Sequence, residues 1–135
     1  MVQDSVRVFV YGTLKPGECN YATYCEGRVI KQYEAIAHGS LFDLPMGYPA
    51  MAPGHDPVYG VVLCLADATY LSVLDDLEDY VPGRSTHENE YNRELIRVFS
   101  PEGKPLGTAW TYVMETEKAL AFGGTLLPGG VWTTV

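Results

Sequence analysis

The stretch Val8-Phe9-Val10-Tyr11-Gly12-Thr13-Leu14-Lys15-Pro16-Gly17 guides the interpretation of the whole chain. Residues 6–11 are mostly β-branched or aromatic, which predicts a strand buried on both faces. The run ends at Gly12, and Pro16-Gly17 marks a turn. A buried strand that opens into a glycine loop leaves backbone N–H groups at its end, and these can hold a carboxylate or a developing oxyanion. A strand with an ordinary tight turn is the simpler alternative, and the glycine spacing is not that of a P-loop or a dinucleotide site.

The composition is that of one folded domain, which we place at residues 1–135. The chain has 135 residues, 47% of them hydrophobic, so it can bury a sizeable core without disulfides. Its formal charge of −8 argues against nucleic acid or an anionic membrane as partner. Residues 1–5 do not open a signal peptide, and no apolar run approaches the ~18 residues of a membrane span. We therefore expect a soluble cytoplasmic protein.

The cysteines and histidines form no metal or redox pattern. Cys19, Cys25 and Cys64 are odd in number and lack Cys-x-x-Cys spacing, and Cys64 lies in an apolar run that predicts a core position. The three histidines are scattered. We therefore expect no metal site, while a nucleophilic cysteine stays an alternative to simple packing.

The apolar pattern predicts about six strands and one solid helix. Asp67 is expected to cap the helix, which continues to about Tyr80, and Asn20 to cap a short helix near Cys25. A proline-rich loop is expected at Pro45–Pro57, long enough to cover a site. Extended or strand-like stretches are expected at residues 6–11, 29–44, 58–65, 90–99 and 106–114, with a helical turn at 117–122. This pattern indicates an α+β barrel or a strongly curled sheet.

A carboxylate on the apolar face of the predicted helix needs an explanation. Leu71, Leu74 and Glu78 share that face. Burial, the C-terminal end of the helix dipole and an aspartate one turn earlier all push the pKa of Glu78 upward. A carboxyl whose pKa lies near neutrality can both take and return a proton. A structural ion pair, for instance with Arg93, is the alternative explanation.

Tyr11-Gly12-Thr13-Leu14 after the first strand and Leu74-Asp75-Asp76-Leu77-Glu78 after a valine-rich strand resemble the γ-glutamylcyclotransferase-like family. The resemblance covers nearly the whole chain and is greatest to small bacterial members and γ-glutamylamine cyclotransferases. One departure is Asp79, where many members have glycine. Further motifs agree, in order along the chain: Gly39–Leu44, Tyr48-Pro49-Ala50, Val58-Tyr59-Gly60, Tyr91-x-Arg93, Ala109-Trp110-Thr111-Tyr112 and Gly130-Val131-Trp132.

The resemblance implies a fold, a reaction and a set of site residues. The implied fold is a small mixed β-barrel with a few external helices. In the implied reaction, the free α-amine of a γ-glutamyl group attacks its own γ-carbonyl, which yields 5-oxoproline and releases an amine or amino acid without a cofactor. Glu78 is implied as the catalytic general acid and base. The implied substrate-binding residues are Tyr11, Gly12, Thr13, Leu14 and Tyr112.

A non-catalytic small-molecule-binding or regulatory module on the same fold is the alternative reading. The intact carboxylate at Glu78 favours the enzyme. Arg93 is a candidate partner of Glu78 or of the substrate's α-carboxylate, whereas Asn20 and Lys15 are candidates only through the loop pattern. The group attached to the γ-glutamyl moiety, physiological turnover and the oligomeric state stay open at the level of sequence.

Overall fold

The computed structural model describes residues 6–133 and shows an α+β fold built on one mixed sheet of six strands. Two 3₁₀ turns, η1 (Ala68–Tyr70) and η2 (Thr86–Glu88), precede α2 and β4. The strands and helices follow in the order β1 (Val6–Val10), α1 (Tyr21–Tyr24), β2 (Val29–Asp43), β3 (Pro49–Leu65), α2 (Leu71–Leu77), β4 (Asn92–Phe99), β5 (Pro105–Val113), α3 (Thr116–Ala121) and β6 (Thr125–Leu126).

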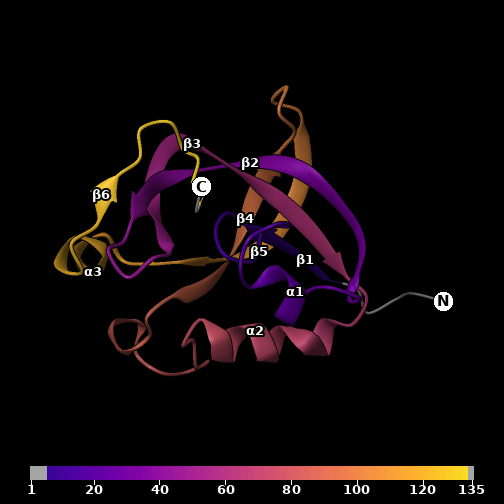
Figure 1. Cartoon of the computed structure of the whole chain (residues 1–135), viewed down its shortest axis with the longest axis horizontal. Helices are drawn as coiled ribbons and strands as arrows, with labels where there is room; N and C mark the ends of the chain where they lie inside the picture. Colours follow the sequence, from indigo (N-terminus) through magenta and orange to yellow (C-terminus); the bar gives the residue numbers. More distant parts are fainter. Residues whose placement is uncertain (1–5, 134–135) are drawn as a thin grey trace.

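The strand pairings join distant parts of the chain. β1 lies antiparallel to β3 and parallel to β5, and β4 lies antiparallel to β5. β2 and β3 form a long antiparallel hairpin that arches over the sheet, while α2 runs along the opposite side (Figure 1). β2 also meets β4 at Ile36 and Phe99, so each of these five strands has at least two neighbours, and the short β6 pairs with β2. The predicted α+β class with mixed strand directions is confirmed, the six strands form one mixed sheet, and its description as a barrel stays a prediction.

The first strand is buried on both faces, as its sequence predicts. Val8, Phe9 and Val10 are consecutive and expose 0%, 1% and 4% of their surface. Val8 and Val10 belong to one hydrophobic cluster, and Phe9 belongs to the other. Because successive side chains of a strand point to opposite faces, β1 separates two halves of the core.

The predicted loop at Pro45–Pro57 is wrong, because β3 begins at Pro49. Only the turn between Leu44 and Tyr48 separates β2 from β3. Along the hairpin, Ser40 is paired with Ala52 but Gly39 with Asp56, so residues 53–55 form a bulge. Prolines are tolerated at the first residue of a strand and at bulges, which explains how a proline-rich segment can still be a strand.

The predicted helix begins after Asp67 as the 3₁₀ turn η1, which leads into α2 at Leu71, and it ends earlier than predicted. The side chain of Asp67 accepts a hydrogen bond from the backbone N–H of Thr69 at 2.9 Å, so the expected cap is confirmed. The helix ends at Leu77, Glu78 is the capping residue that follows, and Asp79 has φ of 56°. That left-handed backbone is the conformation that glycine adopts most easily after a helix. The left-handed backbone at Asp79 is therefore a physical reason for the glycine that the resemblance expects at this position.

The remaining elements agree closely with the sequence pattern. The expected strands near 90–99 and 106–114 are β4 and β5, and the helical turn near 117–122 is α3. Within residues 6–133, no helix combines the length and apolar character needed to cross a membrane.

Candidate active site

A cavity of about 210 Å³ opens where the ends of several elements meet. The loop after β1 forms one wall, and the end of α2, the turn between β2 and β3 and the start of β4 supply others. All six residues that the sequence analysis assigned to the site line this cavity: Tyr11, Gly12, Thr13, Leu14, Glu78 and Tyr112. The structure therefore brings together two motifs that are more than sixty residues apart.

The loop after β1 is held in shape by hydrogen bonds to the residues that follow it, of which Asn20 also lines the cavity. The Lys15 N–H donates to the Gly12 carbonyl at 3.0 Å, and the Asn20 N–H donates to the Thr13 carbonyl at 2.9 Å. The sequence predicts that Asn20 caps α1. Its side chain makes no capping hydrogen bond and instead donates to the Thr13 hydroxyl at 3.0 Å. In the described part of the chain, the N–H groups of Gly12, Thr13 and Leu14 have no hydrogen-bond partner. Such groups are available to an anionic ligand atom.

Gly12 is required by close packing and not by its backbone conformation. Its φ is not in the left-handed region, since Gly12 is absent from the residues with positive φ. A Cβ added at this position would lie 2.6 Å from Cγ of Pro49 in the opposite wall. Any larger side chain would therefore have to displace the start of β3.

Glu78 carries the carboxyl group with the most unusual surroundings. The residue is half-buried and lines the cavity just after the last turn of α2. Within residues 6–133, no hydrogen bond or ion pair holds its carboxyl group. Burial raises the pKa of Glu78 from 4.5 to about 8, and the negative charge of Glu90 adds to the effect. The upward direction agrees with the sequence analysis, although the neighbouring charge is Glu90 and not the aspartate one turn earlier.

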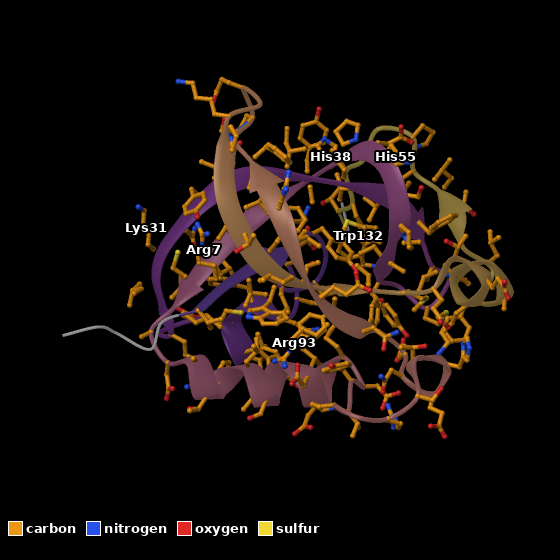
Figure 2. All side chains as sticks on the ribbon, turned by 180° about the vertical axis from the view of Figure 1, so that it is seen from behind. Arg7, Lys31, His38, His55, Arg93 and Trp132 are labelled. Atoms are coloured by element: carbon orange, nitrogen blue, oxygen red, sulfur yellow. The ribbon has the colours of Figure 1, made fainter. Side chains whose placement is uncertain are left out.

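The Arg93 guanidinium pairs with Asp75, not with Glu78. Arg93 Nη1 lies 3.3 Å from Asp75 Oδ2, and the Tyr112 hydroxyl donates to Asp75 Oδ1 at 2.8 Å. The guanidinium also lies over the rings of Tyr80 and Trp110, at 5.4 Å and 4.8 Å from their centroids. Figure 2 shows Arg93 between α2 and the strands above it. The predicted alternative, a structural pair of Glu78 with Arg93, is therefore wrong.

The buried tyrosines of the cavity use their hydroxyl protons inside the protein. The Tyr11 hydroxyl donates to the Tyr112 carbonyl at 2.6 Å and accepts from the Met51 N–H at 3.0 Å. The Tyr91 hydroxyl donates to the Pro49 carbonyl at 2.6 Å. Burial raises the pKa of Tyr11, Tyr91 and Tyr112 above the ordinary value, so all three stay protonated. Tyr11 and Tyr112 therefore line the cavity, and the hydrogen bonds that their hydroxyls donate hold its walls in place.

Sequence reasoning missed two residues of the cavity, Tyr48 and Glu90. The Tyr48 hydroxyl donates to Glu90 Oε2 at 2.5 Å. Burial, followed by this hydrogen bond, raises the pKa of Tyr48 to about 12, so Tyr48 remains the donor. Tyr48 belongs to the motif Tyr48-Pro49-Ala50, and Glu90 directly precedes the motif Tyr91-x-Arg93; these motifs were the only signal in the sequence.

Lys15 has a structural contact outside the cavity. Its ammonium donates to the carbonyl of Trp132, and the Trp132 indole N–H donates to Asp43 Oδ1 at 3.0 Å. Trp132 therefore anchors the C-terminal segment to the loop after β1 and to the end of β2. Among the residues that the structure describes, no three His, Cys, Asp or Glu side chains are grouped so that they could hold a metal ion.

Comparison with known proteins agrees with this geometry. The family described as "Gamma-glutamyl cyclotransferase, AIG2-like" matches residues 8–134. The chain belongs to this family. A Vibrio cholerae relative, whose name marks it as a candidate gamma-glutamylcyclotransferase, is 37% identical over 125 residues, which cover 93% of each chain. The names of the family and of this relative indicate a cyclising enzyme, and the matched residues include both motifs that line the cavity.

A second relative and a solved structure agree with the family assignment. The "Gamma-L-glutamyl-butirosin B gamma-glutamyl cyclotransferase" of Niallia circulans is 34% identical over 114 residues, which cover 84% of this chain and 70% of that protein. The crystal structure of an AIG2-like protein from Mus musculus superposes with a TM-score of 0.67 at 23% identity, and the match covers 96% of this chain and 88% of that one. The latter similarity supports the gamma-glutamyl cyclotransferase fold.

Proposed function

We propose that this chain is a γ-glutamyl cyclotransferase that releases 5-oxoproline from a γ-glutamyl amine or peptide, with Glu78 as general acid and base. One observation carries the proposal: the Glu78 carboxyl, whose pKa is raised to about 8, lines the same cavity as three backbone N–H groups, and none of these groups has a partner among the described residues. A proton acceptor and oxyanion donors are the two elements that this acyl transfer needs.

Glu78 acts twice in the proposed reaction, first as the proton acceptor and then as the proton donor. The α-ammonium group of the substrate, with an ordinary pKa near ~8, must lose a proton before its nitrogen attacks the γ-carbonyl carbon. Glu78, with a pKa of about 8, is matched to this transfer. The new C–N bond closes the five-membered ring, the ring nitrogen gives up its second proton, and the C–N bond to the leaving amine then breaks. Glu78 passes the first proton to the leaving nitrogen, and the second proton is taken up by the released amine, so 5-oxoproline and an ammonium product result.

The loop after β1 supplies fixed donors for the negative charge of this reaction. The N–H groups of Gly12, Thr13 and Leu14 have no partner within residues 6–133, and all three residues line the cavity beside tyrosines whose hydroxyls are already bonded. Fixed donors of this kind stabilise a developing oxyanion more effectively than mobile water does. Because nucleophile and carbonyl belong to one molecule, holding the γ-glutamyl chain folded contributes much of the remaining acceleration.

The decisive experiment measures 5-oxoproline release from a panel of γ-glutamyl amines and dipeptides by the wild-type protein and by Glu78→Gln. The amide keeps the shape of the carboxyl group but cannot accept the proton, so turnover should fall by about 10²–10⁴-fold. Glu102→Gln is the matched control, because Glu102 is exposed in the turn after β4 and outside the cavity. It should retain wild-type turnover.

Two outcomes would contradict the proposal. Normal turnover by a folded Glu78→Gln variant would remove Glu78 from the chemistry. A wild-type protein that binds 5-oxoproline but releases it from no γ-glutamyl compound would indicate a non-catalytic binding module on the same fold.

A further inference from the structure

The cavity contains a second carboxylate that the proposed mechanism does not use. Glu90 lines the cavity from the segment between α2 and β4. A surface glutamate normally moves freely in solvent and is explained by solubility alone. The contacts of Glu90 and of its neighbours are of a different kind.

The backbone that carries Glu90 is fixed by the residue before it. Asn89 is 1% exposed. Its side-chain oxygen accepts from the Val81 N–H at 3.1 Å and from Arg84 Nε at 2.6 Å, and its side-chain nitrogen donates to Asn92 Oδ1 at 2.8 Å. A buried amide with this many bonds holds the segment in one arrangement. The position of Glu90 is therefore built into the fold.

The backbone N–H of Glu90 is tied to the end of α2. It points to two acceptors on Asp79, the carbonyl oxygen at 3.3 Å and the carboxylate Oδ2 at 3.2 Å. Asp79 is held in turn by an ion pair with Arg84 at 3.2 Å. Because Asp79 directly follows Glu78, these hydrogen bonds connect the backbone of Glu90 to the backbone next to Glu78.

The side chain of Glu90 is directed by one hydrogen bond and keeps a free oxygen. Oε2 accepts from the Tyr48 hydroxyl at 2.5 Å, whereas Oε1 has no hydrogen-bond partner within residues 6–133. The charge of Glu90 also acts on Glu78, where it contributes to the raised pKa. A fixed carboxylate with one unpaired oxygen is suited to binding a cation.

The depth of the cavity tells where along a substrate Glu90 would act. Tyr11, Gly12 and Leu14 are buried, whereas Tyr48 and Glu90 are half-buried and stand closer to solvent. In the described part of the chain, no Lys, Arg or His lines the cavity. If the loop N–H donors hold the γ-glutamyl group beside the buried residues, its leaving amine extends toward the more exposed part of the cavity, where Glu90 carries negative charge.

We propose that Glu90 is a specificity-determining residue, which selects γ-glutamyl amines whose leaving group carries a second positive charge. This inference rests on the proposed function. A diamine attached through one nitrogen presents its other ammonium group to Glu90 Oε1. A γ-glutamyl amino acid instead presents a carboxylate, which the like charge repels. The bonds made and broken are unchanged, and only the distal part of the leaving amine differs.

The experiment compares γ-glutamyl-(4-aminobutyl)amide with γ-glutamyl-pentylamide, two amides of the same length in which a terminal ammonium group replaces a methyl group. The wild-type protein should prefer the charged amide by about fivefold in kcat/KM at low salt, the upper end for a partly exposed ion pair. The preference should shrink as salt is added, because salt screens the interaction. Glu90→Gln should abolish it, and Glu102→Gln should keep it.

Each remaining result bears on the proposal. Equal loss of activity on both amides in Glu90→Gln would mean that Glu90 acts on the common γ-glutamyl group, which overturns the inference. Release from neither amide would contradict the proposed function alone, and binding of both amides would then be measured by calorimetry. Tighter binding of the charged amide that Glu90→Gln abolishes would still support the role of Glu90, and equal binding would overturn it.

Discussion

Asp75 and Glu78 lie one turn apart at the end of α2 but occupy opposite environments. Asp75 is 5% exposed, paired with Arg93 and hydrogen-bonded by Tyr112. Glu78 is half-buried in a cavity and has no partner among the described residues. The two carboxyl groups therefore differ mainly in what the rest of the fold brings to them. Burial makes a carboxylate costly, and the presence or absence of a partner decides whether it becomes structural or reactive.

The partners of Asp75 come from two paired strands. Arg93 of β4 and Tyr112 of β5 are directly opposite each other in the antiparallel register, so both side chains reach the same carboxylate. Glu78 follows the last helical residue and lies beyond this pair. Asp75 thus belongs to a closed polar cluster, whereas Glu78, three residues later, lines an open cavity.

The largest stability effect is expected from breaking the closed cluster. Asp75→Asn keeps the shape of the side chain but leaves the Arg93 guanidinium without its counter-charge. Removing one member of a buried pair should destabilise the fold by about 3 kcal/mol, the low end of the range for such pairs, because Arg93 keeps its contacts with two aromatic rings. The melting temperature should fall by about 10 °C.

Asp76→Asn is the matched control for this change, since Asp76 is the exposed neighbour on the same helix. It should melt close to the wild-type protein. Equal melting temperatures of Asp75→Asn and Asp76→Asn would contradict the assignment of Asp75 to a stabilising pair and weaken the contrast with Glu78.

A second effect, on the pH dependence of stability, is expected from the raised pKa of Glu78. Between pH 4.5 and about 8 the folded protein keeps a proton on Glu78 that the unfolded chain has lost. The free energy of unfolding should therefore decrease as pH rises through this window and level off above it. Glu78→Gln has no proton to lose, so its advantage in melting temperature over the wild type should be least near pH 4.5 and greatest above pH 8.

Melting curves of both proteins over this range would test the prediction. A difference between them that shrinks as pH rises would mean that the Glu78 carboxylate is stabilised in the folded state. Glu78 would then resemble Asp75, and the comparison of the two residues would fail.

The smallest effect is expected at Asp79. Asp79→Gly relieves a φ of 56° but removes the ion pair with Arg84, whose side chains are 53% and 29% exposed, respectively. Exposed pairs contribute ~0–1 kcal/mol, and aspartate tolerates the left-handed region, so the two changes should nearly cancel. The urea midpoint should therefore change little. A large loss of stability would mean that the Asp79 carboxylate holds the Glu90 segment more firmly than its exposure indicates.

Local sequence signals predicted the parts of the fold that depend on neighbouring residues. The apolar run of β1 and the Asp67 cap of α2 depend on such residues, and both are confirmed. The segment Pro45–Pro57 was misassigned because its prolines are accommodated by a bulge against β2, which no local pattern reveals. Asn20 was assigned as a cap although its side chain bonds Thr13 in the preceding loop.

The sequence by itself determined that a buried strand opens into a glycine loop and that a glutamate follows an apolar helix. These features follow from side-chain periodicity and turn chemistry, which act over a few residues. Only the tertiary structure decided that Arg93 pairs with Asp75, that Glu78 is left without a partner, and that Tyr48 orients Glu90 at the same cavity. The physical reason is that the energy of a charge depends on what surrounds it in space, and those neighbours come from strands and turns far apart in the chain.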